Sequence, residues 1–224
     1  MSITGLFLIN KPIGITSHDV VGYLRKITGE KTIGHAGTLD PMASGLMIIA
    51  IGREFTKQIS KFSELEKEYL ATLTLGKNST TYDAEGELSP VSDREPDVEE
   101  AKKVLTNFIG WQEQMPPIFS AKKIKGKKAY ELARAGKEVV MKSVKVQIKS
   151  IDLIKYHYPE IEFKVMVSAG TYIRSLAYDI GTNLKTGAYL SKLFRTQIGQ
   201  YSFNQAIDLS SVKSSNDLLN VRIN

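Results

Sequence analysis

The sequence predicts an α+β fold with a mixed, mainly antiparallel sheet. Short apolar or alternating runs, which are typical of strands, occur at 6–9, 46–51, 68–75, 144–156 and 161–167. Apolar residues at helical spacing predict helices at 17–29, 97–108, 127–135 and 171–184. These segments follow one another in irregular order, which favours an α+β arrangement over repeated strand–helix units.

The N-terminal part is expected to hold a strand, a helix and a second strand. The apolar run Leu6–Ile9 predicts the first strand. Ser17 is the expected N-cap of the helix, and Gly29 is expected to end it. Residues 33–45 are polar and rich in glycine, so we expect an irregular segment before the buried strand at 46–51.

The remaining chain is expected to form three helices and three strands around two irregular regions. The helix that starts at Pro96-Asp97 should direct five apolar residues to the core: Val98, Ala101, Val104, Leu105 and Phe108. Residues 77–96 are expected to be a turn-rich loop. The two long strands pair in a hairpin through Pro159, and the tail from Ser210 is short and polar.

Composition excludes several classes of chemistry. The chain of 224 residues contains no cysteine, and its three histidines have no metal-ligand spacing. A disulfide scaffold, thiol catalysis and thiolate metal sites are therefore excluded, and no metal is expected. The N-terminus does not resemble a signal peptide, and the longest apolar run, Leu46–Ile51, is too short to span a bilayer. We expect a cytoplasmic protein with no membrane partner.

The positive charge is concentrated in one segment. The whole chain has a formal net charge of +6. Between Met115 and Lys145, nine basic and two acidic residues give this segment +7. Lysines beside aromatic side chains suit a phosphate backbone with bases that can stack, although a solvated surface run has the same composition. The segment therefore favours a nucleic-acid partner without proving one.

Asp40 is the candidate catalytic residue by its surroundings. It lies in the glycine-rich stretch Gly34–Gly45 and directly precedes Pro41, which restricts its backbone. A carboxylate on such a rigid turn can serve chemistry. The alternative is an ordinary N-cap followed by proline at the first helical position, and the spacing alone favours the cap.

Several blocks of sequence stand in order between residue 5 and about residue 205. They are Leu8-Ile9-Asn10-Lys11-Pro12-x-Gly14-x-Thr16-Ser17, Gly34-His35-Ala36-Gly37-Thr38-Leu39-Asp40-Pro41-x-Ala43-x-Gly45, Glu66-Lys67-Glu68-Tyr69 with Gly76 and Tyr82-Asp83-Ala84-Glu85-Gly86, Met115-Pro116-Pro117-x-Phe119-Ser120-Ala121-x-Lys123-x-x-Gly126, and Ser168-Ala169-Gly170-Thr171-Tyr172-Ile173-Arg174 followed by Leu193-x-Arg195. In content and order, the set resembles the motifs of the TruB family of bacterial tRNA pseudouridine synthases.

The resemblance implies an enzyme that isomerises the tRNA T-loop uridine, by family convention position 55, to pseudouridine. It implies a sheet flanked by helices, base flipping and no cofactor. Asp40 matches the family's catalytic aspartate. It either attacks the sugar or acts as a base that forms a glycal-type intermediate, and the sequence leaves both routes open.

Further site residues follow from the same resemblance. Arg174 matches the arginine that pairs with the catalytic aspartate, Tyr69 the tyrosine that stacks on the flipped uracil, and His35 the histidine that enters the RNA stem. Tyr172 and Leu193 are expected to line the pocket, and Lys11 is expected to contact phosphate or support the site. Without the resemblance these are a surface arginine and lysine, core side chains, and a histidine bonded to backbone.

The resemblance also assigns the basic segment and the domain limits. Residues of about 110–145 form an insertion that clamps the RNA stem-loop, with five lysines as candidate contacts: Lys122, Lys123, Lys125, Lys127 and Lys128. Residues 1–210 are expected to be the catalytic domain. Residues 211–224 are expected to be a short tail without the family's usual C-terminal PUA-type domain, in a monomer.

Two alternatives remain from the sequence. One is an RNA-binding or tRNA-folding module with weak or no catalysis, which the +7 segment alone supports. The other is a nucleoside or glycoside hydrolase that uses Asp40 and releases free uracil. The presence of Asp40, Tyr69 and Arg174 together argues against the first.

Overall fold

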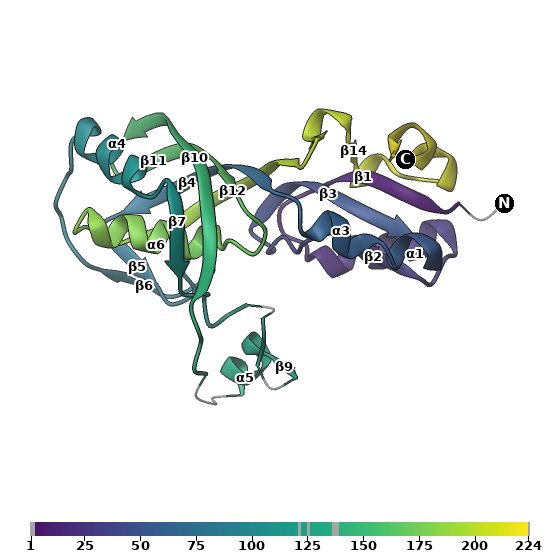
Figure 1. Ribbon diagram of the computed structural model, residues 1–224, viewed down its shortest axis with the longest axis horizontal. Coiled ribbons are helices and arrows are strands. Elements are labelled where there is room, and N and C mark those ends of the chain that lie inside the picture. Colours follow the sequence, from purple (N-terminus) through teal and green to yellow (C-terminus); the bar gives the residue numbers. More distant parts are fainter. Residues whose placement is uncertain (1–2, 121, 125, 136–138, 224) are drawn as a thin grey trace. The chain divides into compact units, whose positions relative to one another are not determined.

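The computed structural model describes residues 3–120, 122–124, 126–135 and 139–223 (Figure 1). The chain forms two compact units. Unit 1 comprises Met1–Leu70 and Lys192–Asn224, and unit 2 comprises Ala71–Ser191. Two strands, β4 (Lys67–Leu75) and β12 (Ala188–Ile198), contribute residues to both units. Across the described residues, none of the helices is both long and apolar enough to cross a membrane.

Unit 1 is built on strands in the order β14-β1-β3-β12. Its other elements are β1 (Gly5–Lys11), α1 (Ser17–Thr28), β2 (Ile33–His35), β3 (Ala43–Ile51), α2 (Arg53–Thr56), α3 (Ile59–Ser63), β13 (Tyr201–Ser202), η1 (Phe203–Gln205), β14 (Ile207–Asp208), η2 (Leu209–Ser211), η3 (Ser215–Val221) and β15 (Arg222–Ile223). Antiparallel pairs β1–β3 and β2–β3 stand beside parallel pairs β1–β14 and β3–β12. The mixed sheet expected from the sequence is therefore confirmed.

Strand β3 lies at the centre of unit 1 because it is apolar from Leu46 to Ile51 and buried at every position except Ser44. Strand β1 pairs with all of it, from Gly5 opposite Ile51 to Lys11 opposite Gly45. On its other edge, β3 pairs first with β12 at 43–45 and then with β2 at 49–51. Because β12 and β2 pair with different parts of this edge of β3, a fork opens between them. Leu6, Leu8, Leu46 and Ile48 share a core onto which α2, α3 and the C-terminal residues pack.

Two expectations for unit 1 are wrong in detail. Thr16, not Ser17, is the N-cap of α1, because its hydroxyl accepts from Asp19 N–H at 3.1 Å while the Asp19 carboxylate accepts from Thr16 N–H at 2.8 Å. Residues 33–45 are not wholly irregular, since β2 and the start of β3 lie within them. The expected end of α1 is confirmed at Gly29, whose φ of 72° suits glycine.

The C-terminal residues bury apolar side chains, although the composition of this segment is mainly polar. Val212 and Leu218 are fully buried. Strand β15 pairs with β1, with Leu6 opposite Ile223. Residues 211–223 therefore pack as part of unit 1.

Unit 2 contains the strand order β12-β4-β11-β10-β7. Its elements are β5 (Lys77–Ser79), β6 (Leu88–Pro90), α4 (Val98–Asn107), β7 (Gly110–Gln114), β8 (Lys123–Ile124), β9 (Lys127–Lys128), α5 (Ala129–Arg134), β10 (Val144–His157), β11 (Glu160–Val167) and α6 (Ile173–Asn183). The predicted hairpin of β10 and β11 is confirmed, with Tyr156 opposite Ile161. Helix α4 packs on β10 and on α6.

Three expectations for unit 2 have different outcomes. Asp97 caps α4 as expected, since its carboxylate accepts from Glu100 N–H at 2.8 Å. Val98 does not face the core, because it lies in the exposed first turn, whereas Ala101 and Leu105 are buried. The region 77–96 is not only a loop, since β5 and β6 form a short hairpin there.

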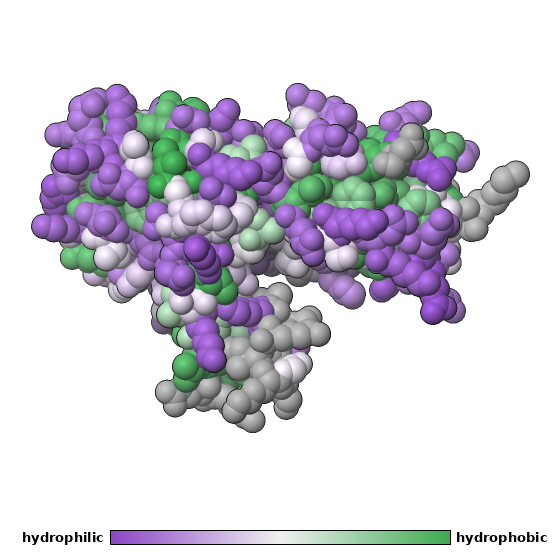
Figure 2. Space-filling model, viewed as in Figure 1, coloured by the Kyte–Doolittle hydropathy of each residue, from purple (hydrophilic) through white to green (hydrophobic). Residues whose placement is uncertain are grey.

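The insertion leaves unit 2 between β7 and β10 and contains β8, β9 and α5 (Figure 1). The helix expected at 127–135 is α5, which begins at Ala129 after a two-residue strand. Figure 2 shows that the visible face of both units is mainly hydrophilic, with scattered hydrophobic areas. Lys125 lies outside the described residues.

Candidate active site

Asp40 opens a turn that leads into a strand. Its carbonyl accepts from the Ala43 N–H at 3.1 Å, and β3 begins at Ala43. Proline at the second position and aspartate at the first are typical of a β-turn. The helix-cap interpretation of Asp40 is therefore wrong, because no helix follows it. Asp40 is half-buried.

The backbone on both sides of Asp40 is held by the N-terminal part of the chain. The Ser17 hydroxyl donates to the Leu39 carbonyl at 2.9 Å and accepts from the Leu39 N–H at 2.8 Å. The Pro41 carbonyl accepts from the Gly14 N–H at 2.8 Å. Ser17 is free for this because Thr16 caps α1. The turn is thereby fixed immediately before and after the carboxylate.

Lys11 supports the segment that carries Gly14. It is fully buried, and its ammonium donates to the carbonyls of Pro12 at 2.9 Å and Ile15 at 2.7 Å. The surface-lysine alternative is therefore wrong. The burial also favours the supporting role over a direct phosphate contact.

Arg195 occupies the fork between β12 and β2. It is 1% exposed, and its Nε donates to the Leu46 carbonyl at 2.7 Å while Nη2 donates to the Gly37 carbonyl at 3.2 Å. Gly45 lies opposite it in the β3–β12 register. A Cβ on Gly45 would lie 2.7 Å from the Arg195 backbone nitrogen, so glycine permits this close approach. Arg195 thus ties together the two ends of the segment 37–46.

Two further basic groups lie near Arg195. Lys67 is 6% exposed and donates to the Ser63 and Leu65 carbonyls at 2.6 and 2.5 Å. Burial, with a contribution from the Arg195 cation, lowers the pKa of Lys67 to about 8. Burial and Arg195 also lower the pKa of His35, and a hydrogen bond to the Gly37 backbone opposes part of this change. His35 is therefore neutral at pH 7.

His35, Tyr69 and Leu193 lie on strands of unit 1. His35 ends β2 opposite Ile49, and its buried Nδ1 has no hydrogen-bond partner among the described residues. Tyr69 lies on β4 and is 7% exposed. Leu193 is the register partner of Ala43, the last residue of the Asp40 turn. The core alternatives for Tyr69 and Leu193 agree with their burial, which does not exclude a role in the site.

Arg174 is buried in unit 2, so the surface-arginine alternative is wrong. Its Nη1 forms an ion pair with Asp83 Oδ2 at 3.1 Å and donates to the Thr81 carbonyl at 3.3 Å. Its Nη2 donates to the Phe119 carbonyl at 2.9 Å. These groups fix the direction of the guanidinium from two loops of unit 2.

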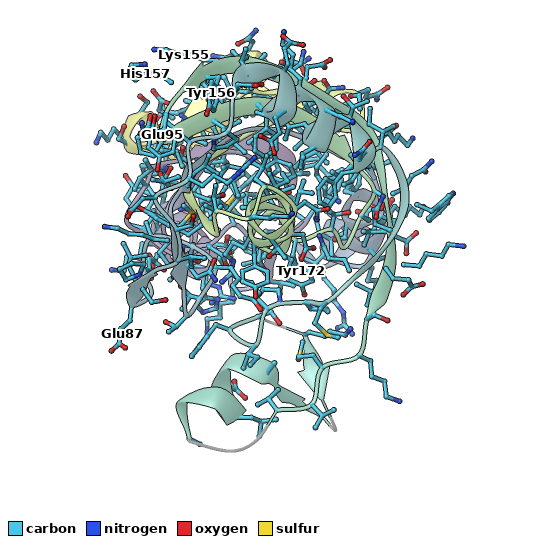
Figure 3. All side chains as sticks on the ribbon, turned by 90° about the vertical axis from the view of Figure 1, so that its left-hand side faces the viewer. Glu87, Glu95, Lys155, Tyr156, His157 and Tyr172 are labelled. Atoms are coloured by element: carbon cyan, nitrogen blue, oxygen red, sulfur yellow. The ribbon has the colours of Figure 1, made fainter. Side chains whose placement is uncertain are left out.

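Tyr172 is the N-cap of α6, two residues before Arg174, and it lies near the point where the chain runs into the insertion (Figure 3). The Gln114 side chain donates to the Tyr172 carbonyl at 3.0 Å and accepts from the Tyr172 N–H at 2.8 Å. The Ser175 hydroxyl donates to the Met115 carbonyl at 2.7 Å. The first turn of α6 is therefore attached to the base of the insertion.

The structure places four of the five candidate lysines in the insertion. The Lys122 ammonium donates to the Lys142 carbonyl at 3.1 Å. Lys123 of β8 lies opposite Lys128 of β9 in the backbone register of the two strands. Lys127 lies on β9, and the prediction for Lys125 falls outside the described residues. Among the described residues, no three or more His, Asp or Glu side chains are placed to hold a metal ion.

Three residues with clear structural roles were not predicted from the sequence. Asp83 and Arg195 lie within motifs, but nothing in the local pattern pointed to the contacts that they form. Gln114 directly precedes the block that begins at Met115 and is a polar residue at the end of a strand. Its burial and its place in an edge strand became visible only in the structure.

Comparison with known proteins assigns the class. The family model for "TruB family pseudouridylate synthase (N terminal domain)" matches residues 25–173. The tRNA pseudouridine synthase B of Protochlamydia amoebophila is 45% identical over 214 residues, which cover 96% of this chain and 81% of the relative. That of Clostridium novyi is 42% identical over 212 residues, covering 95% and 73%.

Solved structures agree with the class. A Cbf5-Nop10-Gar1 complex gives a TM-score of 0.73 at 28% identity over 92% of this chain, and an H/ACA RNP bound to a substrate RNA gives 0.69 at 26% over 92%. The chain spans about half of the matched chain in each structure, 53% and 51%. Fold and sequence thus define a pseudouridylate synthase. The chain belongs to the TruB family.

Proposed function

We propose that this chain is a tRNA pseudouridine synthase that isomerises the T-loop uridine at position 55. The observation that carries the proposal is Asp40, which stands on a turn held by Ser17, Gly14 and the start of β3. A carboxylate that must meet one sugar carbon benefits from such fixed geometry. The relatives named tRNA pseudouridine synthase B support the same activity.

The reaction needs one carboxylate and no net redox change. The bond between ribose C1′ and uracil N1 breaks, the base turns, and a bond from C1′ to C5 forms. The proton on C5 leaves, and N1 gains one. Asp40 either attacks C1′ and is released when the C1′–C5 bond forms, or removes the C2′ proton to give a glycal-type intermediate and returns that proton as the new bond forms. No water enters the product, so the second carboxylate of a glycosidase is not required.

The other site residues take supporting roles in this proposal. The role proposed for Arg174, which follows from the family resemblance, is to keep the carboxylate of the catalytic aspartate ionised. Tyr69 stacks on the flipped uracil, and Tyr172 and Leu193 line its pocket. His35 enters the RNA stem and holds the space left by the base, for which its neutral state at pH 7 is suitable. Lys11 supports the site through its contacts with Pro12 and Ile15.

The partner proposed for the insertion is the tRNA T stem-loop. The +7 charge of the segment 115–145 supports phosphate contacts by Lys122, Lys123, Lys125, Lys127 and Lys128. A cytoplasmic location, a monomeric state and independence from metals and cofactors stay predictions.

The test is incubation with an unmodified tRNA transcript, followed by chemical mapping of pseudouridine. We expect product at the T-loop uridine only, none in a transcript with cytidine at that position, and none with Asp40→Asn at nearly unchanged RNA affinity. Tight binding without product would support the RNA-folding module instead. Release of free uracil would support a hydrolase. Substantial turnover by Asp40→Asn would remove Asp40 from its role.

A further inference from the structure

We propose that Gln114 is a positioning residue for the isomerisation, which acts by holding the backbone of Tyr172 at the start of α6. The inference rests on the proposed function, because it takes Arg174 and Tyr172 as members of the site. Gln114 is the last residue of β7 and is 3% exposed.

The contact between Gln114 and Tyr172 is paired and specific. Gln114 Nε2 donates to the Tyr172 carbonyl at 3.0 Å, and Oε1 accepts from the Tyr172 N–H at 2.8 Å. A side-chain amide therefore satisfies both backbone groups of one residue, as a neighbouring strand would. Tyr172 makes no side-chain cap of its own for α6. Gln114 supplies the external contact that fixes where the helix starts.

The position of the Tyr172 backbone determines the position of the Arg174 backbone. Arg174 lies two residues further on, in the first turn of α6, and its guanidinium must reach Asp83 Oδ2 at 3.1 Å and the Phe119 carbonyl at 2.9 Å. A displacement of the Tyr172 peptide moves the Arg174 Cα while those acceptors stay in place. Small displacements of catalytic groups are costly, since about 1 Å can reduce a rate about a hundredfold.

The space that the Gln114 side chain fills does not require an amide. A buried amide costs free energy unless both its donor and its acceptor are paired, and an apolar side chain of similar length would avoid that cost. Here both atoms of the amide are used on a single residue. The chemistry of Gln114 therefore matches orientation of the Tyr172 peptide better than simple packing.

Two variants and two matched controls test the inference with steady-state kinetics on a T-loop-containing tRNA. Gln114→Met keeps the length and removes both hydrogen bonds, and we expect kcat to fall between about tenfold and a hundredfold with KM nearly unchanged. Gln112 lies on the same strand, and its amide donates to the Phe108 carbonyl. Gln112→Met should therefore keep wild-type kcat.

Gln114→Glu adds a pH signature that a packing role would not produce. A protonated glutamic acid has the donor and the acceptor of glutamine, whereas the carboxylate has no donor for the Tyr172 carbonyl. Burial raises the pKa of a glutamate at this position. The ratio of variant to wild-type kcat should therefore increase as pH falls, and the Gln112→Glu ratio should not change. Because glutamate matches glutamine in size, this variant decides the question if Gln114→Met does not fold.

The outcomes separate the two proposals. If wild-type protein forms no pseudouridine, the proposed function fails. If wild-type protein is active and Gln114→Met has wild-type kcat, or the Gln114→Glu ratio is independent of pH, the positioning role of Gln114 is overturned while the proposed function stands.

Discussion

Arg174 and Asp83 form an ion pair from which water is almost excluded. Nη1 and Oδ2 are 3.1 Å apart, and the two side chains are 7% and 2% exposed. Asp83 also accepts from the Thr81 hydroxyl at 2.5 Å and from the Glu85 N–H at 3.0 Å. The carboxylate is therefore itself fixed, and it provides a rigid anchor for the guanidinium.

We expect Asp83→Ala to lower the free energy of unfolding by about 3 kcal/mol or more, because it leaves the Arg174 cation buried without its carboxylate. Asp83→Asn keeps the shape and an acceptor, so its cost should be smaller. Urea unfolding measures both. The double variant Asp83→Ala, Arg174→Met should be more stable than the sum of the single effects predicts, because the unpaired charge is gone. Strictly additive costs would contradict the coupling.

Ser17→Ala should lower both stability and turnover. It leaves the N–H and the carbonyl of Leu39 buried without their partner, at a cost of about 2 kcal/mol. Since Leu39 precedes Asp40, we expect kcat to fall while KM for tRNA stays nearly constant. The control is Ser63→Ala, because Ser63 donates only to the Ile59 carbonyl in its own helix. Equal effects of the two changes would argue against the special role of Ser17.

The sequence predicted the elements better than it predicted their contacts. Gly29 and Asp97 end and begin helices by local geometry, so local pattern was sufficient. Thr16 and Ser17 are both plausible caps, and the local contacts between Thr16 and Asp19 decide for Thr16. The role of Ser17 instead depends on Leu39, 22 residues away, and lies outside any local window.

Asp40 illustrates the same limit at the candidate site. An Asp-Pro pair fits a β-turn as well as the helix cap that the spacing alone favours. The choice depends on Ala43, which must enter β3 and pair with Leu193, about 150 positions further along the chain. Resemblance to the family identified Asp40 because it carries that long-range information. Gln114 lies outside the motif blocks that the resemblance covered, and its role needed the structure.

Gly45→Ala should be much more destabilising than Gly29→Ala. Both glycines have positive φ, 109° and 72°, so each substitution carries backbone strain of about 1 kcal/mol. A Cβ at Gly45 would also meet the Arg195 backbone, whereas nothing lies within 4 Å at Gly29. We expect a loss of at least about 3 kcal/mol at Gly45 in urea unfolding. Similar losses at both sites would show that the close approach of β3 and β12 is readily relaxed.

The insertion lysines should determine the salt dependence of tRNA binding. Replacement of Lys122, Lys123 and Lys125 by glutamate should weaken binding and reduce the slope of log affinity against log salt concentration, because fewer counterions are released. Replacement of Lys26, Lys31 and Lys61, which are exposed in unit 1, is the control with the same change in net charge. An unchanged slope for the insertion variant would count against phosphate contact there.

Lys67 should make the free energy of unfolding increase with pH above about 8. Its pKa is about 8 in the folded protein and 10.5 in the unfolded chain. Below pH 8 both states bind the proton, so the cost of burying the ammonium is present in full and does not vary. Between about pH 8 and 10.5 the folded state releases its proton first, and the unfolded state therefore binds more protons. Stability rises with pH in that window, by up to about 3 kcal/mol.

Lys67→Met isolates this contribution from the other groups that titrate in the same range. The difference in free energy of unfolding, wild type minus Lys67→Met, should increase between pH 8 and 10.5 and be constant between pH 6 and 7.5. Lys61→Met is the control, because Lys61 is exposed and its difference from wild type should stay constant throughout. If the Lys67→Met difference is also constant, Lys67 keeps an ordinary pKa, and Arg195 and burial do not disfavour its charge.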